Sequence, residues 1–263
     1  MNLVIGNTSQ LSNYFSNEYI KISSRNVDLN YLKNNSWDSV YITFAEQRIY
    51  EDNIDYITPN YFITLDIINS LIENTKKIVC YTSCEMWSLS SGKISSETEP
   101  KFKLVDNDYT ISKLLLFNKI KNLRKHDERY NKVIFIHPFY FNSVYRSKYF
   151  LFGKIFDSIL HKKKINVGNL NFYRDMVHAK FVVEQSILAK QDSVVGSGKL
   201  FNIRQFVQDL YKLNNMNFES FVIEESRHLL DGQKLIMADV VNDYTYDDLL
   251  SDTQKELLSF KQG

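Results

Sequence analysis

The feature that most constrains the fold of this chain is a series of short, almost wholly apolar runs separated by stretches of helical character. These runs cover residues 2–6, 19–23, 39–44, 77–83 and 132–139. Strands buried on both faces have this continuous apolar character, whereas half-exposed strands alternate apolar and polar residues. Strands that alternate with helices imply right-handed crossovers and a parallel sheet covered on both sides. The sequence therefore predicts the α/β class, with a Rossmann-like doubly wound parallel sheet.

The pattern loosens beyond about residue 140, and this suggests a division of the chain. We expect residues 1–140 to form the Rossmann-like part, to which later segments return. Residues 141–263 would form mainly a small C-terminal lobe over the carboxyl ends of the strands, where ligands bind in such folds. The predicted helices run from the first strand to about residue 17 and over 28–35, 60–74, 109–125, 152–163 and 178–190, and 193–215 is predicted to be a strand, a Gly turn and a helix.

Composition excludes several classes of protein. The 32 Lys and Arg residues are balanced by 31 Asp and Glu, so the net charge is +1 and no nucleic acid partner is expected. Cys80 and Cys84 lack the further Cys or His residues of a metal site or disulfide framework, so we expect no metal and a reducing cytoplasm. No window approaches the roughly 18 consecutive apolar residues of a membrane span, and none is expected.

The turn after the first strand, "GNTSQLS", contains part of a dinucleotide-binding pattern. Gly6 stands at the first of the three glycine places, and Ser9 and Ser12 stand at the other two. A serine is small, and its hydroxyl could meet a phosphate at a helix N-terminus. Taken alone, the pattern is a weak motif, and a plain strand-to-helix turn would be the preferred interpretation.

The end of the second strand, "ISSRNVD", bears on which dinucleotide would bind. An acidic residue there usually holds the ribose 2′-hydroxyl of NAD, whereas an Arg accommodates the 2′-phosphate of NADP. Ser23, Ser24 and Arg25 occupy this place, so NADP is slightly favoured over NAD. Asp28 lies one turn further on, better placed for the adenine edge.

A tyrosine and a lysine in "YTISK", Tyr109 and Lys113, are spaced to share one face of a helix. The spacing alone does not distinguish a core tyrosine beside a surface lysine from a tyrosine whose proton is loosened by an ammonium group. The surrounding motifs decide between the two, because they occur in a fixed order along the chain. That order is Gly6, Asp28, "ITFAEQ" (42–47), Asn60, "YTSCEMW" (81–87), "ETEP" (97–100), "YTISK" (109–113), "HPFYFN" (137–142) and "YRDMVHAK" (173–180).

This series resembles the extended short-chain dehydrogenase/reductase family, whose epimerases, dehydratases and reductases act on nucleotide-linked sugars. The resemblance covers residues 2–215. It implies that Ser83, Tyr109 and Lys113 are catalytic. Tyr109 would exchange a proton with the sugar hydroxyl, and Ser83 would bond the same oxygen. Lys113 would lower the tyrosine pKa together with the nicotinamide charge, and would hold the nicotinamide ribose. The implied cofactor-binding residues are Gly6, Thr8, Ser9, Gln10, Leu11, Arg25, Asp28, Ala45, Asn60, Tyr109 and Lys113.

The resemblance also implies a nucleotide-diphosphate sugar as substrate, bound by the C-terminal lobe. Arg174 matches the place of an arginine that grips the pyrophosphate, and Asn142 would support the same group. Glu85 stands where dehydratases and some decarboxylases carry a glutamate that works at the sugar ring, and so joins the candidate catalytic residues. His137 and His178 are interpreted as structural, and Cys84 as a buried small residue.

Several reactions remain open at this point. A 4-keto sugar reductase is the first choice, an epimerase or a 4,6-dehydratase or decarboxylase using Glu85 is the alternative, and a non-catalytic nucleotide-binding relative is the outside alternative. A homodimer is compatible with all of them. The sequence also departs from the family pattern, since the turn keeps one glycine of three and Trp87-Ser88 replaces the usual Tyr-Gly.

Overall fold

A parallel sheet of six strands forms the centre of the molecule, whose computed structural model describes residues 1–48, 53–88, 90–100, 107–225 and 235–262. The strand order is β11-β6-β4-β3-β1-β2, and every neighbouring pair is parallel. The predicted doubly wound sheet is thereby confirmed. Its strands are β1 (Asn2–Ile5), β2 (Ile20–Ile22), β3 (Trp37–Ile42), β4 (Thr75–Tyr81), β6 (Val133–Pro138) and β11 (Ser193–Val195).

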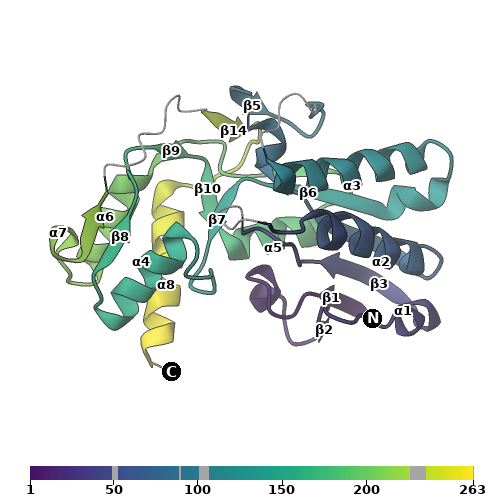
Figure 1. Cartoon of the computed structure of the whole chain (residues 1–263), viewed down its shortest axis with the longest axis horizontal. Coiled ribbons are helices and arrows are strands. Elements are labelled where there is room, and N and C mark those ends of the chain that lie inside the picture. The colour runs from purple at the N-terminus through teal and green to yellow at the C-terminus, as the bar shows by residue number, and fades with distance from the viewer. Residues whose placement is uncertain (49–52, 89, 101–106, 226–234, 263) are drawn as a thin grey trace.

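Two layers of helices cover this sheet (Figure 1). On one face α1 (Leu29–Asn34), α2 (Thr64–Leu71) and α3 (Asp108–Arg124) contribute Leu32, Ile67 and Leu114 to a core with the strands. On the other face Val182 of α5 (Ala179–Leu188) and Leu11 pack against Val79. The sheet therefore separates two cores. The remaining helical turns of this part are η1 (Leu11–Tyr14), the π-helical η2 (Thr58–Ile63), η3 (Cys84–Trp87) and η5 (Glu128–Lys132).

The helix predicted from the first strand to about residue 17 is wrong. The structure has only η1, four residues of 3-10 helix, after which Phe15 is extended. Short polar side chains compete here for backbone carbonyls: the Ser12 hydroxyl lies 2.9 Å from the Asn7 carbonyl oxygen and 2.7 Å from that of Ser9, and the Asn13 amide donates to Ser9. Such local bonds disfavour a regular helix.

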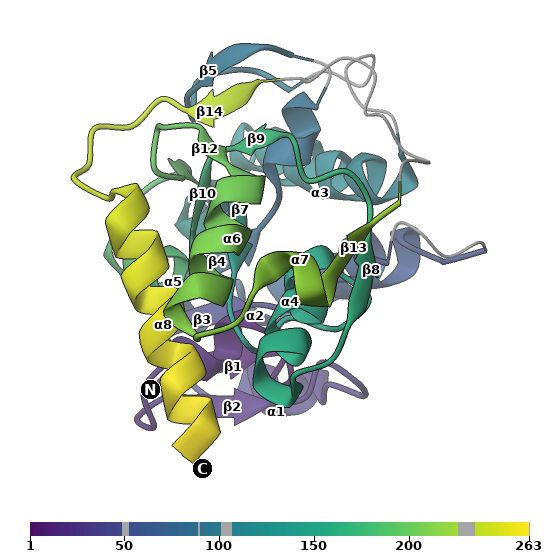
Figure 2. The ribbon, with the colours of Figure 1, turned by 90° about the vertical axis from the view of Figure 1, so that its left-hand side faces the viewer.

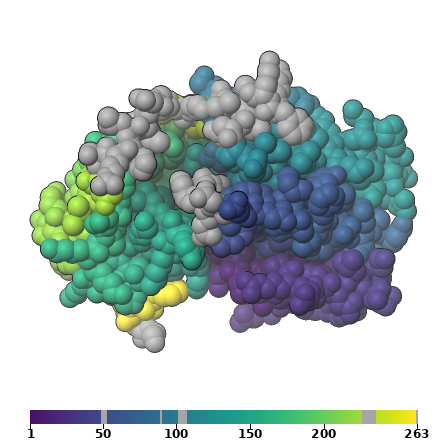
Figure 3. Space-filling model, in the orientation of Figure 1, coloured from purple at the N-terminus to yellow at the C-terminus, as the bar shows by residue number. Residues whose placement is uncertain are grey.

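The rest of the chain forms the C-terminal lobe, while α5 and β11 return to the sheet. Figure 2 shows the lobe from its outer side, with α8 (Tyr246–Gln262) crossing it next to α6 (Ile203–Leu213). The lobe and the sheet part lie against each other across the middle of the molecule (Figure 3). The other elements of the lobe are α4 (Leu151–His161), α7 (Phe218–Phe221), β7 (Tyr140–Asn142), β8 (Ile165–Val167), β9 (Tyr173–Arg174), β10 (Met176–His178), β12 (Phe201–Asn202) and β13 (Val222–Glu224).

Several elements were not predicted from the sequence, α8 among them. The short parallel pair of β5 (Gly92–Ile94) and β14 (Ile236–Ala238) joins segments about 140 residues apart in the sequence, so no local pattern announces it. The long helix α8 lies beyond the region that the family resemblance covers. Within the described ranges, no helix is both long enough and apolar enough for a membrane crossing.

Candidate active site

Ser83, Tyr109 and Lys113 come together at the carboxyl end of β4. Ser83 follows the strand and caps η3, where its hydroxyl accepts a hydrogen bond from the Glu85 amide at 3.2 Å. Tyr109 and Lys113 occupy the first turns of α3, and the Ser83 side chain lies close enough to Tyr109 to lower its pKa. The Lys113 ammonium donates to the Tyr81 carbonyl oxygen at 3.1 Å.

Burial dominates the electrostatics of this group. Tyr109 is 8% and Lys113 4% exposed. Burial raises the pKa of Tyr109, while the Ser83 side chain and the nearby Arg146 guanidinium lower it. The expected lowering of the tyrosine pKa included the nicotinamide charge, so for the protein with its dinucleotide bound it stays a prediction. Burial also lowers the pKa of Lys113, to about 8, because the charged form loses its hydration.

Glu85 is bonded to Tyr140, which is also in contact with Arg174. The Tyr140 hydroxyl donates to the Glu85 carboxylate at 2.5 Å. The Arg174 guanidinium lies over the Tyr140 ring, 4.8 Å from its centroid, and equally close to the ring of Phe172. Glu85 and Arg174 thus contact the same tyrosine, one at its hydroxyl and the other at its ring. Cys84 beside them is fully buried and burial raises its pKa well above the usual range, which fits the predicted small core residue.

Asn142 and the two histidines are packed into the protein. Asn142 is fully buried, and its amide donates to the Met176 sulfur at 3.4 Å and accepts from Thr253 at 3.5 Å, so a substrate role for it stays a prediction. His137 is buried among aromatic rings, and burial lowers its pKa to about 4. His178 caps α5. The ring contacts of His137 and the capping bond of His178 are those of structural residues.

The turn after β1 lies at the point where the strand order of the sheet reverses, between β1 and β3, which is where doubly wound sheets bind dinucleotides. Gly6 has a φ of +113°, and a Cβ there would come within 2.9 Å of the Phe44 amide nitrogen and the Thr43 hydroxyl. A glycine is therefore required. Both polar atoms of the Gln10 side chain are buried without a hydrogen-bond partner in the described part of the chain. Such orphaned groups fit a polar ligand at this turn.

The other predicted cofactor residues differ in their surroundings. Thr8 is exposed, Leu11 is buried, and the Ser9 hydroxyl accepts from the Ser12 amide at 3.2 Å rather than pointing freely at a ligand. Ala45 is half-buried in the segment after β3. Asn60 holds that segment in place, because its side chain bonds both the amide and the carbonyl of Glu46 and, at 3.0 Å, the hydroxyl of Ser112 on α3.

Arg25 and Asp28 lie beyond the end of β2. Arg25 is exposed, and its amide donates to the Ser23 hydroxyl at 3.1 Å. The Asp28 carboxylate caps α1 by accepting from the amides of Asn30 and Tyr31. Asp28 thus has a structural task that is independent of any ligand.

Two further residues belong to this site although the sequence did not single them out. Tyr140 lies inside the quoted stretch "HPFYFN", so a signal was present. Arg146 lies in an irregular loop that has no helical or strand periodicity, and only the fold brings its guanidinium near Tyr109, where it also donates to the Gln47 amide oxygen at 3.2 Å.

These features define an α/β protein with a doubly wound parallel sheet and a largely buried Ser-Tyr-Lys group, and its fold is that of the extended short-chain dehydrogenase/reductases. No family model and no curated protein matches the chain. Solved structures match it over its whole length. MoeE5 in complex with UDP-glucose and NAD has a TM-score of 0.80 at 15% identity, covering 100% of this chain and 99% of that one.

Two further solved structures show the same likeness. RMD from Pseudomonas aeruginosa complexed with NADPH has a TM-score of 0.77 at 14% identity, with 98% of this chain and 99% of that chain covered. The dTDP-glucose 4,6-dehydratase from Bacillus anthracis in complex with NAD has a TM-score of 0.74 at 14% identity, with coverages of 100% and 97%. At such identities the likeness establishes the fold.

Proposed function

We propose that the protein is an NAD(P)-dependent enzyme of the extended short-chain dehydrogenase/reductase family that modifies the sugar of a nucleotide-diphosphate sugar by hydride transfer. The observation that carries the proposal is the largely buried group at the ligand edge of the sheet, in which the Ser83 side chain lies next to Tyr109 and Lys113 lies one helical turn away. The solved structures of like fold, which hold NAD, NADPH or UDP-glucose, support the classes of cofactor and substrate.

The nicotinamide ring, when bound, supplies or accepts the hydride. Tyr109 then moves the proton between its hydroxyl and the sugar oxygen, and Ser83 hydrogen-bonds that same oxygen. Lys113 is the cation beneath this pair, and Arg174 is positioned to bind the diphosphate as a guanidinium fork. Gly6 gives the turn its close approach to the pyrophosphate, and the Gln10 amide supplies polar groups there.

The residues at the end of β2 favour one of the candidate reactions. Ser23, Ser24 and Arg25 stand there in place of an acidic residue, which favours NADPH as the dinucleotide. With NADPH bound, Tyr109 would protonate the oxygen of a ketone while hydride reaches the carbon. We therefore place a 4-keto sugar reductase first.

A reaction at Glu85 is the second candidate, because the Tyr140 hydroxyl orients its carboxylate next to the Ser-Tyr pair. A 4,6-dehydratase or decarboxylase would use such a group, and, like an epimerase, would retain its dinucleotide between turnovers. Mass spectrometry of what the purified protein releases on denaturation separates the two classes. Released NAD supports the second candidate, whereas a vacant protein that takes up NADPH supports the reductase.

The test of the proposal is the Tyr109→Phe variant. Removing the hydroxyl deletes the proton path but little packing, so turnover of a 4-keto nucleotide sugar should fall at least about a hundredfold, the contribution typical of a general acid. Dinucleotide affinity, measured by fluorescence titration, should stay near that of the wild type. Tyr130→Phe, which removes an exposed hydroxyl bonded to Asn69, is the matched control. Retention of more than a tenth of the wild-type rate in Tyr109→Phe would refute the assignment.

A further inference from the structure

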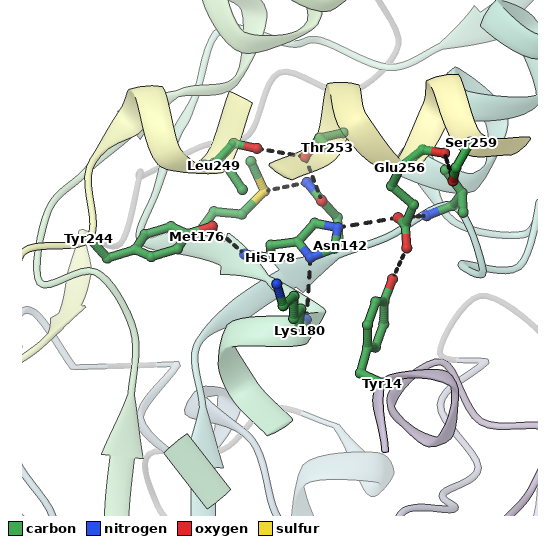
Figure 4. A network of polar contacts seen from close by, with 11 residues as sticks. Tyr14, Asn142, Met176, His178, Lys180, Tyr244, Leu249, Thr253, Glu256 and Ser259 are labelled. Carbon is green, nitrogen blue, oxygen red and sulfur yellow. Dashed lines mark hydrogen bonds and ion pairs between the residues drawn. The ribbon is translucent and has the colours of Figure 1, made fainter. Parts of the chain in front are cut away.

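A single carboxylate on α8 joins the lobe to the turn after β1. Glu256 accepts hydrogen bonds from the Tyr14 hydroxyl, from the Val144 amide at 2.8 Å and from the His178 ring at 3.2 Å. Figure 4 shows the Glu256 side chain reaching from α8 toward Tyr14, which comes from η1. We call these four residues the Glu256 junction. They belong to four separate segments of the chain.

The hydrogen-bond pattern of the junction is complete. The His178 Nδ1 atom accepts from the Lys180 amide at 3.3 Å, which leaves Nε2 as the donor to Glu256. Burial and the carboxylate of Glu256 raise the pKa of Tyr14, so its hydroxyl keeps its proton and donates. The Glu256 side chain is 11% and that of His178 3% exposed. A carboxylate so far removed from water needs such donors.

The helical turn that the junction contacts, η1, is too short to be stable on its own. A helix of one turn has little stability of its own, because its nucleus fixes several residues for one hydrogen bond. The α-helix predicted after β1 is replaced by the four residues of η1. Its end is fixed instead by tertiary contacts, where the Tyr14 ring meets His178 edge-on at a centroid distance of 5.4 Å and its hydroxyl meets Glu256.

The dinucleotide turn is bound directly to η1. Ser12 lies in η1, and its hydroxyl bridges to the carbonyl oxygens of Asn7 and Ser9 in the turn. Tyr14 follows two residues later. A displacement of η1 would therefore move the carbonyls and amides of residues 6–12, which include the turn at Gly6 and the orphaned side chain of Gln10.

We propose that Glu256 is a positioning residue: through Tyr14 it fixes η1, and with it the turn of residues 6–12, in the geometry that binds the dinucleotide. The C-terminal helix α8 thus holds the turn of residues 6–12 in place, because the short helical segment after β1 cannot do so alone. This inference rests on the function proposed above, because it concerns the same dinucleotide site.

The test compares two tyrosine-to-phenylalanine variants that each remove a hydroxyl–carboxylate bond made by α8. Tyr14→Phe removes the bond to Glu256. The control, Tyr246→Phe, removes the bond that the Tyr246 hydroxyl makes with Asp209 of α6 at 2.6 Å, away from the turn. NADPH and NADH are titrated into each variant, with the fluorescence of the reduced nicotinamide as the signal and thermal unfolding as the measure of stability.

Tyr14→Phe should raise the dissociation constant of the dinucleotide about fivefold, the effect of one hydrogen bond of ordinary strength, and Tyr246→Phe should leave it unchanged. Glu256→Gln should weaken binding at least as much. In the double variant the two effects should not add, because both act through one contact. Lys255→Gln, on an exposed neighbouring position of α8, should behave as the wild type.

Three outcomes would overturn the inference. Equal dissociation constants in Tyr14→Phe, Glu256→Gln and the wild type would show that the junction does not position the turn. Equal weakening in Tyr14→Phe and Tyr246→Phe would show only a general loss of stability. If the wild type binds neither dinucleotide, the proposed function itself fails and the inference falls with it, so the two failures are distinguishable.

Discussion

At the scale of single residues, Ser83, Tyr109 and Lys113 form a group in which burial is the main cause of the pKa shifts of the tyrosine and the lysine. The order of motifs along the chain predicted that Ser83, Tyr109 and Lys113 belong together, and the fold brings them to one strand end. Their pKa values depend on burial, which a sequence does not specify. The same reason explains why Arg146 was missed, since its place near Tyr109 is a product of tertiary structure alone.

Lys113 should make the free energy of unfolding depend on pH in the alkaline range. Its pKa falls from an ordinary value near 10.5 to about 8 in the folded state, so between these values the unfolded chain binds more protons. Stability therefore rises as the pH rises through this window, and the cost of burying the charge, on the order of 3 kcal/mol, is fully present below pH 8.

Urea unfolding from pH 7 to pH 10.5 measures this effect against Lys113→Met, which has no charge to bury. The difference in unfolding free energy between wild type and variant should shift in favour of the wild type as the pH rises. The exposed Lys93→Met is the control and should show no such shift, because its ammonium keeps its water. Parallel pH profiles for Lys113→Met and the wild type would contradict the prediction.

Arg25 should affect the choice of dinucleotide. It is exposed, and a salt-screened pair with the 2′-phosphate is expected to favour NADPH over NADH about tenfold, or roughly 1.4 kcal/mol. Arg25→Ala should weaken NADPH and leave NADH almost untouched, and the wild-type preference should shrink as salt is added. Fluorescence titration with both dinucleotides measures this. Equal affinities in the wild type would defeat the prediction and move the first choice from reductase toward epimerase.

At the scale of elements, the long apolar strands and the helices with caps were predictable and the first turn was not. Helix α3 has Asn107 as its cap and lies within a residue of its predicted bounds, because its pattern repeats over several turns. The segment after β1 carries the same kind of start signal. There the side chains of Ser12 and Asn13 bond backbone carbonyls of the turn and compete with the hydrogen bonds of a helix. The helix therefore ends after four residues, and the helix preferences of the single residues do not predict this outcome.

The Gly6 turn yields a prediction with an internal control. Gly6→Ala places a Cβ 2.9 Å from the Phe44 nitrogen and the Thr43 hydroxyl, at a φ of +113°. Gly92→Ala has comparable backbone strain, at a φ of +89°, but meets no atom within 4 Å. Both variants should lose about 1 kcal/mol from the positive φ, and Gly6→Ala should lose more because the end of β3 must move.

Dinucleotide titration and urea unfolding of the two variants separate these effects. Gly6→Ala should lose binding as well as stability, since the turn must shift away from the end of β3. Gly92→Ala should lose stability alone. If the two variants unfold and bind alike, the close approach at Gly6 is not what the turn requires.

At the scale of the whole molecule, the site depends on contacts between the sheet part and the lobe. Glu85 follows a strand of the sheet, Tyr140 begins the chain's departure into the lobe, and Arg174 belongs to β9. The alternation of strands and helices predicted the sheet because each step is local. The packing of the lobe depends on segments as distant as β5 and β14 or Tyr14 and Glu256, and these pairings carry no mark in the sequence.

Arg174 shows what this arrangement should do for the substrate. Its guanidinium carbon lies 4.8 Å from the ring centroids of both Tyr140 and Phe172, and one of its nitrogens donates to the Tyr173 carbonyl oxygen at 2.8 Å, so these contacts order the side chain before a ligand arrives. A clamp on the diphosphate, remote from the reacting carbon, stabilises the ground state and the transition state equally. Arg174→Ala should therefore raise KM for the nucleotide sugar by about 30- to 150-fold, or roughly 2 to 3 kcal/mol, with little change in kcat.

Steady-state kinetics with the nucleotide sugar at saturating dinucleotide measures this split between KM and kcat. Arg129→Ala is the control, because Arg129 is an exposed arginine paired with Asp127 on the far end of the sheet part, and it should leave both constants unchanged. A fall in kcat with KM unchanged would place Arg174 at the reacting carbon instead. An unchanged KM and kcat would mean that the substrate lies elsewhere or carries no diphosphate.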